Sequence, residues 1–300
     1  MNKSIVKKVS IFALVSVLLL TMVVGCDSTD GGNGEGSGGS EESKGTVEIG
    51  YVDWAEGVAM TNLAKVVLED KMDYDVEITM ADAGPIFTSV SSGSYDAFLD
   101  AWYPITHGDY KEKYEDDLTD LGYNYEGARI GLVVPDYVDV DSIEELKEKA
   151  DEFDGEIIGI DSGAGIMDGA ERAIEAYDLD LELISGSEAT MLAALQKAID
   201  NEDWIVVTGW TPHWKFSEWD LKFLDDSQES FGDQENLHSI GKKDIKEDMP
   251  EVAEFLENFQ LNDEELNDLM GAFQDSDDDE LEIARKWMEE NEDLVESWIP

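Results

Sequence analysis

Three tryptophans, Trp54, Trp102 and Trp210, each stand at the end of an apolar run that is typical of a strand. A single tryptophan is more often part of a core than of a binding site, but three at equivalent strand ends favour a shared site. Because aromatic faces attract cations, such a site would suit a positively charged group. The remaining tryptophans are assigned to packing (Trp204, Trp287 and Trp298) or to neither role (Trp214 and Trp219).

A glycine-rich turn offers a second chemical feature. Residues 163–165 read Gly-Ala-Gly, follow a predicted strand and open a predicted helix. The dinucleotide-binding pattern GxGxxG fails because Asp168 stands at its last glycine position, and Gly169 meets the pattern only loosely. We interpret the glycines as allowing backbone N–H groups at a helix N-terminus to approach an anion.

No catalytic or metal-binding set stands out from the sequence. His107, His213 and His238 are far apart and lack the spacing of paired metal ligands. The acidic run 275–280 lacks the glycine and the spacing of a calcium loop. Carboxylates are so abundant that a pair of them is uninformative, and no nucleophile has a partner base. The sequence therefore predicts a protein that is not an enzyme and that needs no cofactor or metal.

The N-terminus has the pattern of a signal peptide. Three lysines within the first eight residues precede an apolar run over 9–24, which is short for a membrane span of about 20 residues. The run ends in Val-Val-Gly-Cys, which resembles the lipobox of bacterial lipoproteins, where the cysteine is diacylated. Cys26 is the only cysteine, so it forms no internal disulfide. A signal anchor with an incidental cysteine is the alternative.

These features predict a signal peptide over 1–25, then a lipidated Cys26 and a flexible linker over 26–45. The linker is dominated by Gly, Ser and Glu and cannot bury apolar surface. We expect an extracytoplasmic protein anchored to the cell membrane through the lipid on Cys26.

The charge balance is extreme, with 72 acidic against 20 basic residues and a formal net charge of −52. Like-charge repulsion excludes nucleic acid as a partner. The acidity predicts either a solvated shell adapted to high salt, where self-repulsion is screened, or a cation-binding surface. The charges are spread along the whole chain, which favours the halophile-type shell.

Strand-like and helix-like patches alternate from residue 46 onward, which predicts an α/β fold of parallel strands covered by helices on both faces. The expected strands cover 47–52, 76–80, 97–103, 130–134, 156–160 and 204–208. The expected helices cover 58–70, 85–91, 142–153, 166–177 and 188–199, and the tail after residue 250 has helical apolar spacing. Ser142 and Glu145 resemble a capping box at the start of the third helix.

Two clusters of such elements predict two lobes, one over 46–128 plus 237–300 and the other over 129–236. The two chain crossings between them would form a hinge. A ligand site is expected in the cleft between the lobes, at strand ends and helix N-termini.

Four segments resemble the glycine betaine-binding proteins of ABC transporters, in order and in spacing. They are GYVDW at 50–54, AWYPITH at 101–107, RIGLVVP at 129–135 and GWTPHW at 209–214. The resemblance runs from about residue 46 to the C-terminus. It implies a two-lobed periplasmic-binding-protein fold of type II that delivers its ligand to an ABC permease.

The resemblance also implies the site residues. The family binds the ligand in a box of three tryptophans, matched here by Trp54, Trp102 and Trp210. It holds the ligand carboxylate with a histidine and two backbone N–H groups, which fall on His107, Gly165 and Ile166. A quaternary ammonium has no N–H to donate, so aromatic faces are the suitable partners.

Glycine betaine is therefore the expected ligand, with choline, carnitine or proline betaine as alternatives. Choline lacks the carboxylate, so the histidine and the backbone N–H groups favour a zwitterion. A secreted enzyme would need a nucleophile that the sequence lacks. A structural surface lipoprotein would leave the ordered aromatic strand ends unexplained.

Overall fold

The computed structural model describes residues 43–276 and 278–300. The predicted signal peptide, Cys26 and most of the predicted linker lie outside the described residues. Strands alternate with helices along the described chain, which confirms the α/β prediction. Across these residues, no helix combines the length and the apolar character that a membrane crossing requires.

The first group of strands is parallel. β1 (Thr46–Tyr51) pairs with β2 (Asp75–Met80) and with β3 (Ala97–Tyr103). Parallel strands need crossover connections, which α1 (Ala55–Asp70) and α2 (Ala83–Ser91) supply. All seven residues of β3 are buried, as expected for a strand covered on both faces.

The second group repeats this arrangement. β5 (Glu156–Ile158) pairs in parallel with β6 (Glu182–Ile184) and with β7 (Val207–Thr211). The crossover helices are α4 (Gly165–Tyr177) and α5 (Glu188–Asn201). Each group therefore brings one strand end with a tryptophan near one helix N-terminus.

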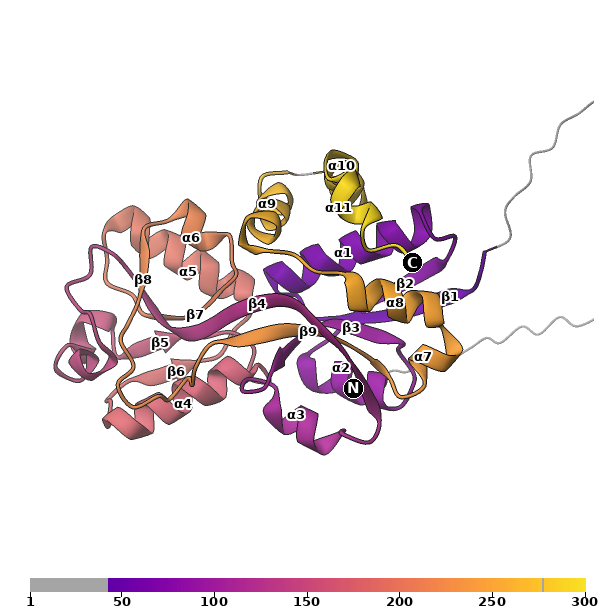
Figure 1. The fold of residues 1–300 in the computed structure, drawn as a ribbon. Coiled ribbons are helices and arrows are strands. Elements are labelled where there is room, and N and C mark those ends of the chain that lie inside the picture. Colours follow the sequence, from indigo (N-terminus) through magenta and orange to yellow (C-terminus); the bar gives the residue numbers. More distant parts are fainter. Residues whose placement is uncertain (1–42, 277) are drawn as a thin grey trace, which may run out of the picture. The chain divides into compact units, whose positions relative to one another are not determined.

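Two long strands join the groups. β4 (Leu118–Pro135) and β9 (Glu235–Lys242) pair antiparallel to each other and run side by side through the middle of Figure 1. β9 is also antiparallel to β3, and β4 to β7 and to the short β8 (Leu221–Phe223). The nine strands of the described chain thus form one mixed sheet in the order β2-β1-β3-β9-β4-β7-β5-β6, with β8 on β4. The expectation of parallel sheets alone was wrong, because the two connecting strands run against their neighbours.

The segment 142–153 departs from the predicted α-helix. It forms two short 3-10 helices, η1 (Ile143–Glu148) and η2 (Ala150–Phe153), and Ser142 makes no capping bond. The Glu145 carboxylate accepts the N–H of Asp141 instead, at 3.0 Å, so the capping box does not close. The turn predicted near residues 122–127 lies within β4, where Gly122 and Gly127 have positive φ beside register shifts typical of bulges.

Other elements also differ in their bounds from the prediction. The strand expected over 204–208 lies at 207–211, and the partly buried Trp204 packs on Phe153 with ring centroids 5.4 Å apart. Sequence patterns did not predict β6, β8 and β9 or the short helices α3 (Gly108–Lys113), α6 (Lys215–Glu218) and α7 (Ile245–Asp248). These elements have only three to eight residues each, too few to show a clear period.

The tail is helical, as predicted. It comprises α8 (Pro250–Asn258), α9 (Asp263–Gln274), α10 (Glu280–Glu290) and α11 (Glu292–Glu296). α9 and α10 contact α1, and the Arg285 guanidinium on α10 donates to the Asp70 carboxylate at 2.7 Å. The buried residues of this region include the predicted apolar series and two tryptophans assigned to packing: Val252, Phe255, Leu256, Phe259, Trp287 and Trp298.

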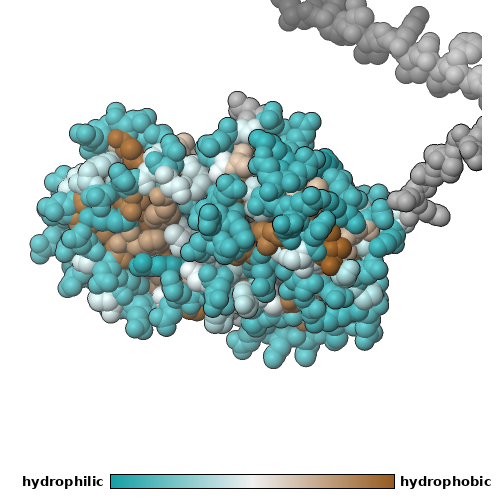
Figure 2. Space-filling model, turned by 45° about the horizontal axis from the view of Figure 1, so that its top comes forward, coloured by the Kyte–Doolittle hydropathy of each residue, from teal (hydrophilic) through white to brown (hydrophobic). Residues whose placement is uncertain are grey.

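The surface reflects the acidic composition. Figure 2 shows a face that is mostly hydrophilic, with its hydrophobic residues in small, separate patches. Several lysines and arginines are paired with carboxylates, for example Lys44 with Glu251 at 2.7 Å and Lys147 with Asp178 at 2.8 Å. Because basic residues are few, most surface carboxylates have none to pair with.

Candidate ligand-binding site

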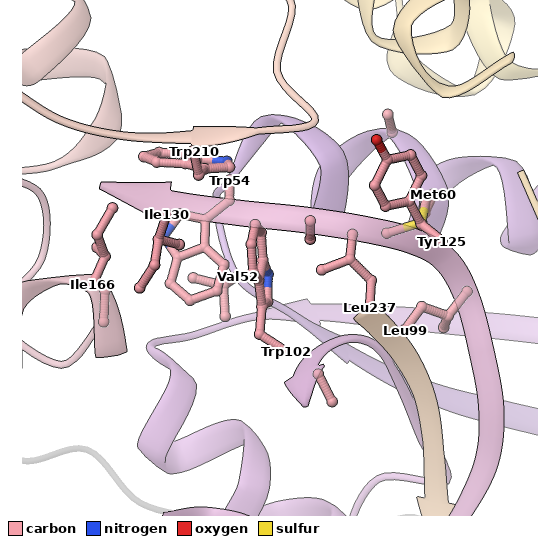
Figure 3. Packing of buried hydrophobic residues seen from close by; sticks show 14 of the residues in the cluster. Val52, Trp54, Met60, Leu99, Trp102, Tyr125, Ile130, Ile166, Trp210 and Leu237 are labelled. Atoms are coloured by element: carbon pink, nitrogen blue, oxygen red, sulfur yellow. The ribbon is translucent and has the colours of Figure 1, made fainter. Parts of the chain in front are cut away.

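One cavity brings together tryptophans from three separate elements. Trp54 stands just before α1, Trp102 lies on β3 and Trp210 lies on β7. Figure 3 shows the three rings gathered beside β4. The cavity is small, about 20 Å³, and is lined by these rings and by Glu56, Thr106, Ile130, Ile160, Ala164, Gly165 and Ile166.

Each of the three rings is held by a hydrogen bond from its indole N–H to a carboxylate. Trp54 Nε1 donates to Asp161 Oδ2 at 3.1 Å. Trp102 Nε1 donates to Asp100 Oδ1 at 2.8 Å, and Trp210 Nε1 donates to Glu56 Oε2 at 2.9 Å. The tryptophans are only 3–5% exposed, so packing and these bonds fix the planes of the rings.

The N-terminus of α4 forms another wall of the cavity. Gly165 and Ile166 are its first two residues, and Ala164 before them offers no side-chain cap. The first N–H groups of an α-helix have no acceptor within the helix, and no described residue accepts from these two. A Cβ at Gly165 would overlap the carbonyl oxygen of Thr106, so only glycine permits this close approach. Two free N–H groups and a helix dipole therefore face the cavity, which suits an anionic group.

His107 lies one layer behind the cavity and does not line it. Its ring stacks on that of Trp54, with centroids 5.9 Å apart and planes 16° apart. Its Nδ1 accepts the backbone N–H of Trp102 at 3.0 Å, so a neutral ring carries its proton on Nε2. Burial lowers the pKa of His107 to about 3, which keeps the ring neutral. Nε2 is buried and finds no hydrogen-bond partner within the described chain.

Glu235 at the start of β9 fixes the loop that carries Thr106 and His107. Its Oε2 accepts the N–H groups of Ile105 and Thr106, at 2.9 and 3.0 Å, and its Oε1 accepts the Thr106 hydroxyl. The carboxylate is 4% exposed. This residue was not predicted, because one glutamate among so many gives no signal in the sequence.

A buried ionic cluster lies beside Trp210. Glu188 at the start of α5 accepts the N–H of Ala55, and its other oxygen lies 3.1 Å from His213 Nε2. Lys215 Nζ lies 4.0 Å from the centre of the Trp210 ring. Burial raises the pKa of Glu56 and raises that of Glu188 to about 8.

Burial also lowers the pKa values of His213 and Lys215 within the same cluster. Sequence reasoning missed the residues of this cluster as parts of the site. It also missed Asp100, although Asp100 gave a usable signal as the lone charge in the apolar strand Ala-Phe-Leu-Asp-Ala-Trp-Tyr.

His238 lies apart from His107 and His213, against Asp120 at 2.8 Å. Over residues 43–276 and 278–300, no cluster of His, Cys, Asp and Glu has the geometry of a metal site.

Residues 45–290 match the family described as the substrate-binding domain of ABC-type glycine betaine transport systems, OpuAC. The chain belongs to this family. Membership confirms the predicted resemblance, and it makes the chain a substrate-binding protein of an ABC importer and not an enzyme. It also makes the protein extracytoplasmic.

Individual relatives agree with the family. The glycine betaine/carnitine transport binding protein GbuC of Listeria monocytogenes serotype 1/2a is 43% identical over 155 residues, which are 51% of each chain. The chain thus spans about half the length of this curated relative. The glycine betaine/L-proline-binding protein ProX of Borrelia burgdorferi is 38% identical with a TM-score of 0.82, over 85% of this chain and 97% of that one.

Lactococcal OpuAC, in a closed conformation complexed with glycine betaine, is 33% identical with a TM-score of 0.80. The match covers 85% of this chain and 99% of that one. These two structures confirm the predicted periplasmic-binding-protein fold with C-terminal helices.

Proposed function

We propose that this protein captures glycine betaine, or a close relative, in the cavity of Trp54, Trp102 and Trp210 and delivers it to the permease of an ABC importer. The observation that carries the proposal is the meeting of three buried aromatic rings with a free helix N-terminus in one cavity. Each desolvated face contributes up to about 2 kcal/mol to binding a quaternary ammonium, and three contribute roughly 6 kcal/mol. A micromolar complex needs about 8 kcal/mol.

The remainder would come from the carboxylate of the ligand. Gly165 and Ile166 offer two N–H groups at the cavity wall, and charge-assisted bonds are the strong ones. His107 would add a third donor through Nε2, provided that the Trp54 ring shifts enough to admit the ligand carboxylate. This set favours a zwitterion over choline. Carnitine and proline betaine carry both groups and stay as alternatives, and GbuC of Listeria is described as a carnitine as well as a betaine binder.

Calorimetric titration with glycine betaine, carnitine, proline betaine and choline tests the proposal. We expect the tightest binding for a ligand that carries both a quaternary ammonium and a carboxylate. Trp204→Ala is a matched control, because Trp204 is partly buried and does not line the cavity. A parent protein that binds none of the four ligands would refute the proposed function.

We further propose that the chain closes on its ligand as two lobes, 46–128 plus 237–300 and 129–236. Support comes from β4 and β9, the strands that join the two parallel groups. Three hydrogen bonds would cross between these lobes, from Trp54 to Asp161, from Trp210 to Glu56 and from Ala55 to Glu188. Small-angle X-ray scattering should show a smaller radius of gyration with ligand than without it, and no change would contradict closure.

A lipid on Cys26 is proposed as the membrane anchor. Its support is the sequence alone, a basic and apolar N-terminus that ends in Val-Val-Gly-Cys. The Gly- and Ser-rich segment that follows would act as a flexible tether to the binding domain. Mass spectrometry of the purified mature protein should find a diacylated N-terminal cysteine.

A further inference from the structure

The carboxylates around the aromatic cavity form a second layer behind the rings. The indole N–H groups of Trp54, Trp102 and Trp210 all donate to carboxylates, which come from the loop before α4, from β3 and from α1. Neutral acceptors such as backbone carbonyls or amides would orient the rings equally well. The negative charge therefore calls for a separate explanation.

In so acidic a chain, an indole can meet a carboxylate by chance. Trp287 illustrates this in the C-terminal helices, where its Nε1 donates to Asp268 at 2.8 Å and the aspartate is exposed. The situation at the cavity is different, because Glu56 and Asp100 are completely buried. A buried charge is costly unless it is paired.

Both buried carboxylates are also incompletely satisfied. Glu56 Oε1 and Asp100 Oδ2 have no hydrogen-bond partner in the part of the chain that is described. Glu56 itself lines the cavity, so a charge placed there would lie beside this side chain. A buried and half-satisfied carboxylate beside an aromatic cavity is the complement of a cation.

Other titratable groups lie around Glu56. Lys215 lies against Trp210 and does not line the cavity, and burial lowers its pKa to about 7, so its side chain is mostly neutral at about pH 8.5. Glu188, His213 and Asp100 complete the surroundings, and burial together with the neighbouring Glu56 charge raises the pKa of Asp100 well above its usual value. At about pH 8.5 Lys215 is mostly neutral while Glu56 and Glu188 are mostly ionised, so the cluster then favours positive charge in the cavity.

We propose that Glu56 and Asp161 are positioning and specificity-determining residues, whose charge strengthens binding of the quaternary ammonium and does so more for a net cation than for a zwitterion. This inference rests on the proposed function. The carboxylates act through the indole rings that they hold, because an N–H bond to a charged acceptor increases the negative potential of the ring face. They also act directly through the field across the cavity.

Coulomb's law gives the size of the expected preference. With an effective dielectric constant of about 20 and about 7 Å between charges, one carboxylate changes the affinity for a cation by about 50-fold. A ligand carboxylate about 10 Å away reduces this effect to about 3-fold for a zwitterion. Removing one charge should therefore change the ratio of choline to glycine betaine affinity by roughly 10-fold or more.

The test compares Glu56→Gln and Asp161→Asn with the parent protein at about pH 8.5, where Glu56, with its pKa raised to about 7 by burial, is ionised. The amides keep an oxygen that can accept the indole N–H, so they remove charge and preserve geometry. Affinities for glycine betaine are measured by calorimetry, and those for choline by displacement of glycine betaine. Asp268→Asn is the matched control, since it alters an indole–carboxylate pair outside the cavity.

We expect choline to lose about 50-fold in affinity and glycine betaine about 3-fold, with the control unchanged. Near pH 6 the parent should already resemble Glu56→Gln, because Glu56 is then mostly protonated and its charge is absent. If the Glu56 variant fails to fold, Asp161→Asn tests the inference instead, because Asp161 is partly exposed and its replacement disturbs the fold less.

Equal losses for both ligands would overturn the inference, because they would mean that the carboxylates only orient the rings. Unchanged affinities would overturn it too. In either case a parent that binds glycine betaine leaves the proposed function intact. A parent that binds neither ligand would overturn both.

Discussion

Replacing His107 can separate two hydrogen bonds that one imidazole ring is expected to make. Its Nδ1 accepts the Trp102 N–H at 3.0 Å, and its Nε2 is the expected donor to the ligand carboxylate. Asparagine can reproduce an acceptor at the Nδ1 position, and glutamine can reproduce a donor at the Nε2 position. His107→Asn should therefore keep the internal bond and lose the ligand bond, whereas His107→Gln should do the reverse.

The expected magnitude follows from the charge on the ligand. A hydrogen bond to a charged group contributes about 1.5–3 kcal/mol, or roughly 10- to 150-fold in affinity. His107→Asn should weaken the binding of glycine betaine by that factor. The affinity for choline, which has no carboxylate, should stay within about 3-fold of that of the parent. His107→Gln should bind glycine betaine more tightly than His107→Asn does. It should also be less stable by about 1–3 kcal/mol, because the buried Trp102 N–H loses its acceptor.

Calorimetry with both ligands and urea unfolding measure these effects. Because the pKa of His107 is lowered to about 3, the ring stays neutral and its donor function should not change between about pH 5 and 8. Equal weakening of glycine betaine and choline in His107→Asn would refute the reasoning, since it would mean that His107 only supports the Trp54 and Trp102 rings. Unchanged glycine betaine affinity would refute it as well.

The remaining predictions concern the rings, the helix N-terminus, the anchor and the charge. Alanine in place of any of the three cavity tryptophans should weaken betaine binding by about 1–2 kcal/mol or more, and phenylalanine by less; parent-like calorimetric affinity in folded variants would disprove the aromatic box. Gly165→Ala should reduce affinity by at least 10-fold, because the added Cβ would overlap a carbonyl oxygen and move the α4 N-terminus; an unchanged Kd would argue against close approach there. Cys26→Ala should release the protein from membranes or block its processing, and unaltered fractionation would rule out the lipid anchor. Thermal midpoints should rise from low to molar NaCl, since a net charge of −52 repels itself; a flat or falling midpoint would favour specific cation sites.

The sequence alone was sufficient for the features that local pattern controls. Apolar runs with strand or helix periodicity predicted the alternation of elements and the helical tail, and four short segments in fixed order indicated the family. The same segments predicted that Trp54, Trp102 and Trp210 would meet. The strand and helix patterns survive in a single sequence because each depends on side chains that are neighbours along the chain, whereas the box of three distant tryptophans was implied by the family resemblance.

Only the tertiary structure decided the features that depend on partners far apart in sequence. The pairing of Glu56 with Trp210 joins residues 154 positions apart, and Glu235 holds a loop 129 positions away. Nothing in the sequence distinguishes the few buried residues among the 72 acidic ones, because burial is a property of the fold and not of the residue. The antiparallel course of β9 was likewise set by its neighbours β3 and β4, since its own eight residues fit either direction of pairing.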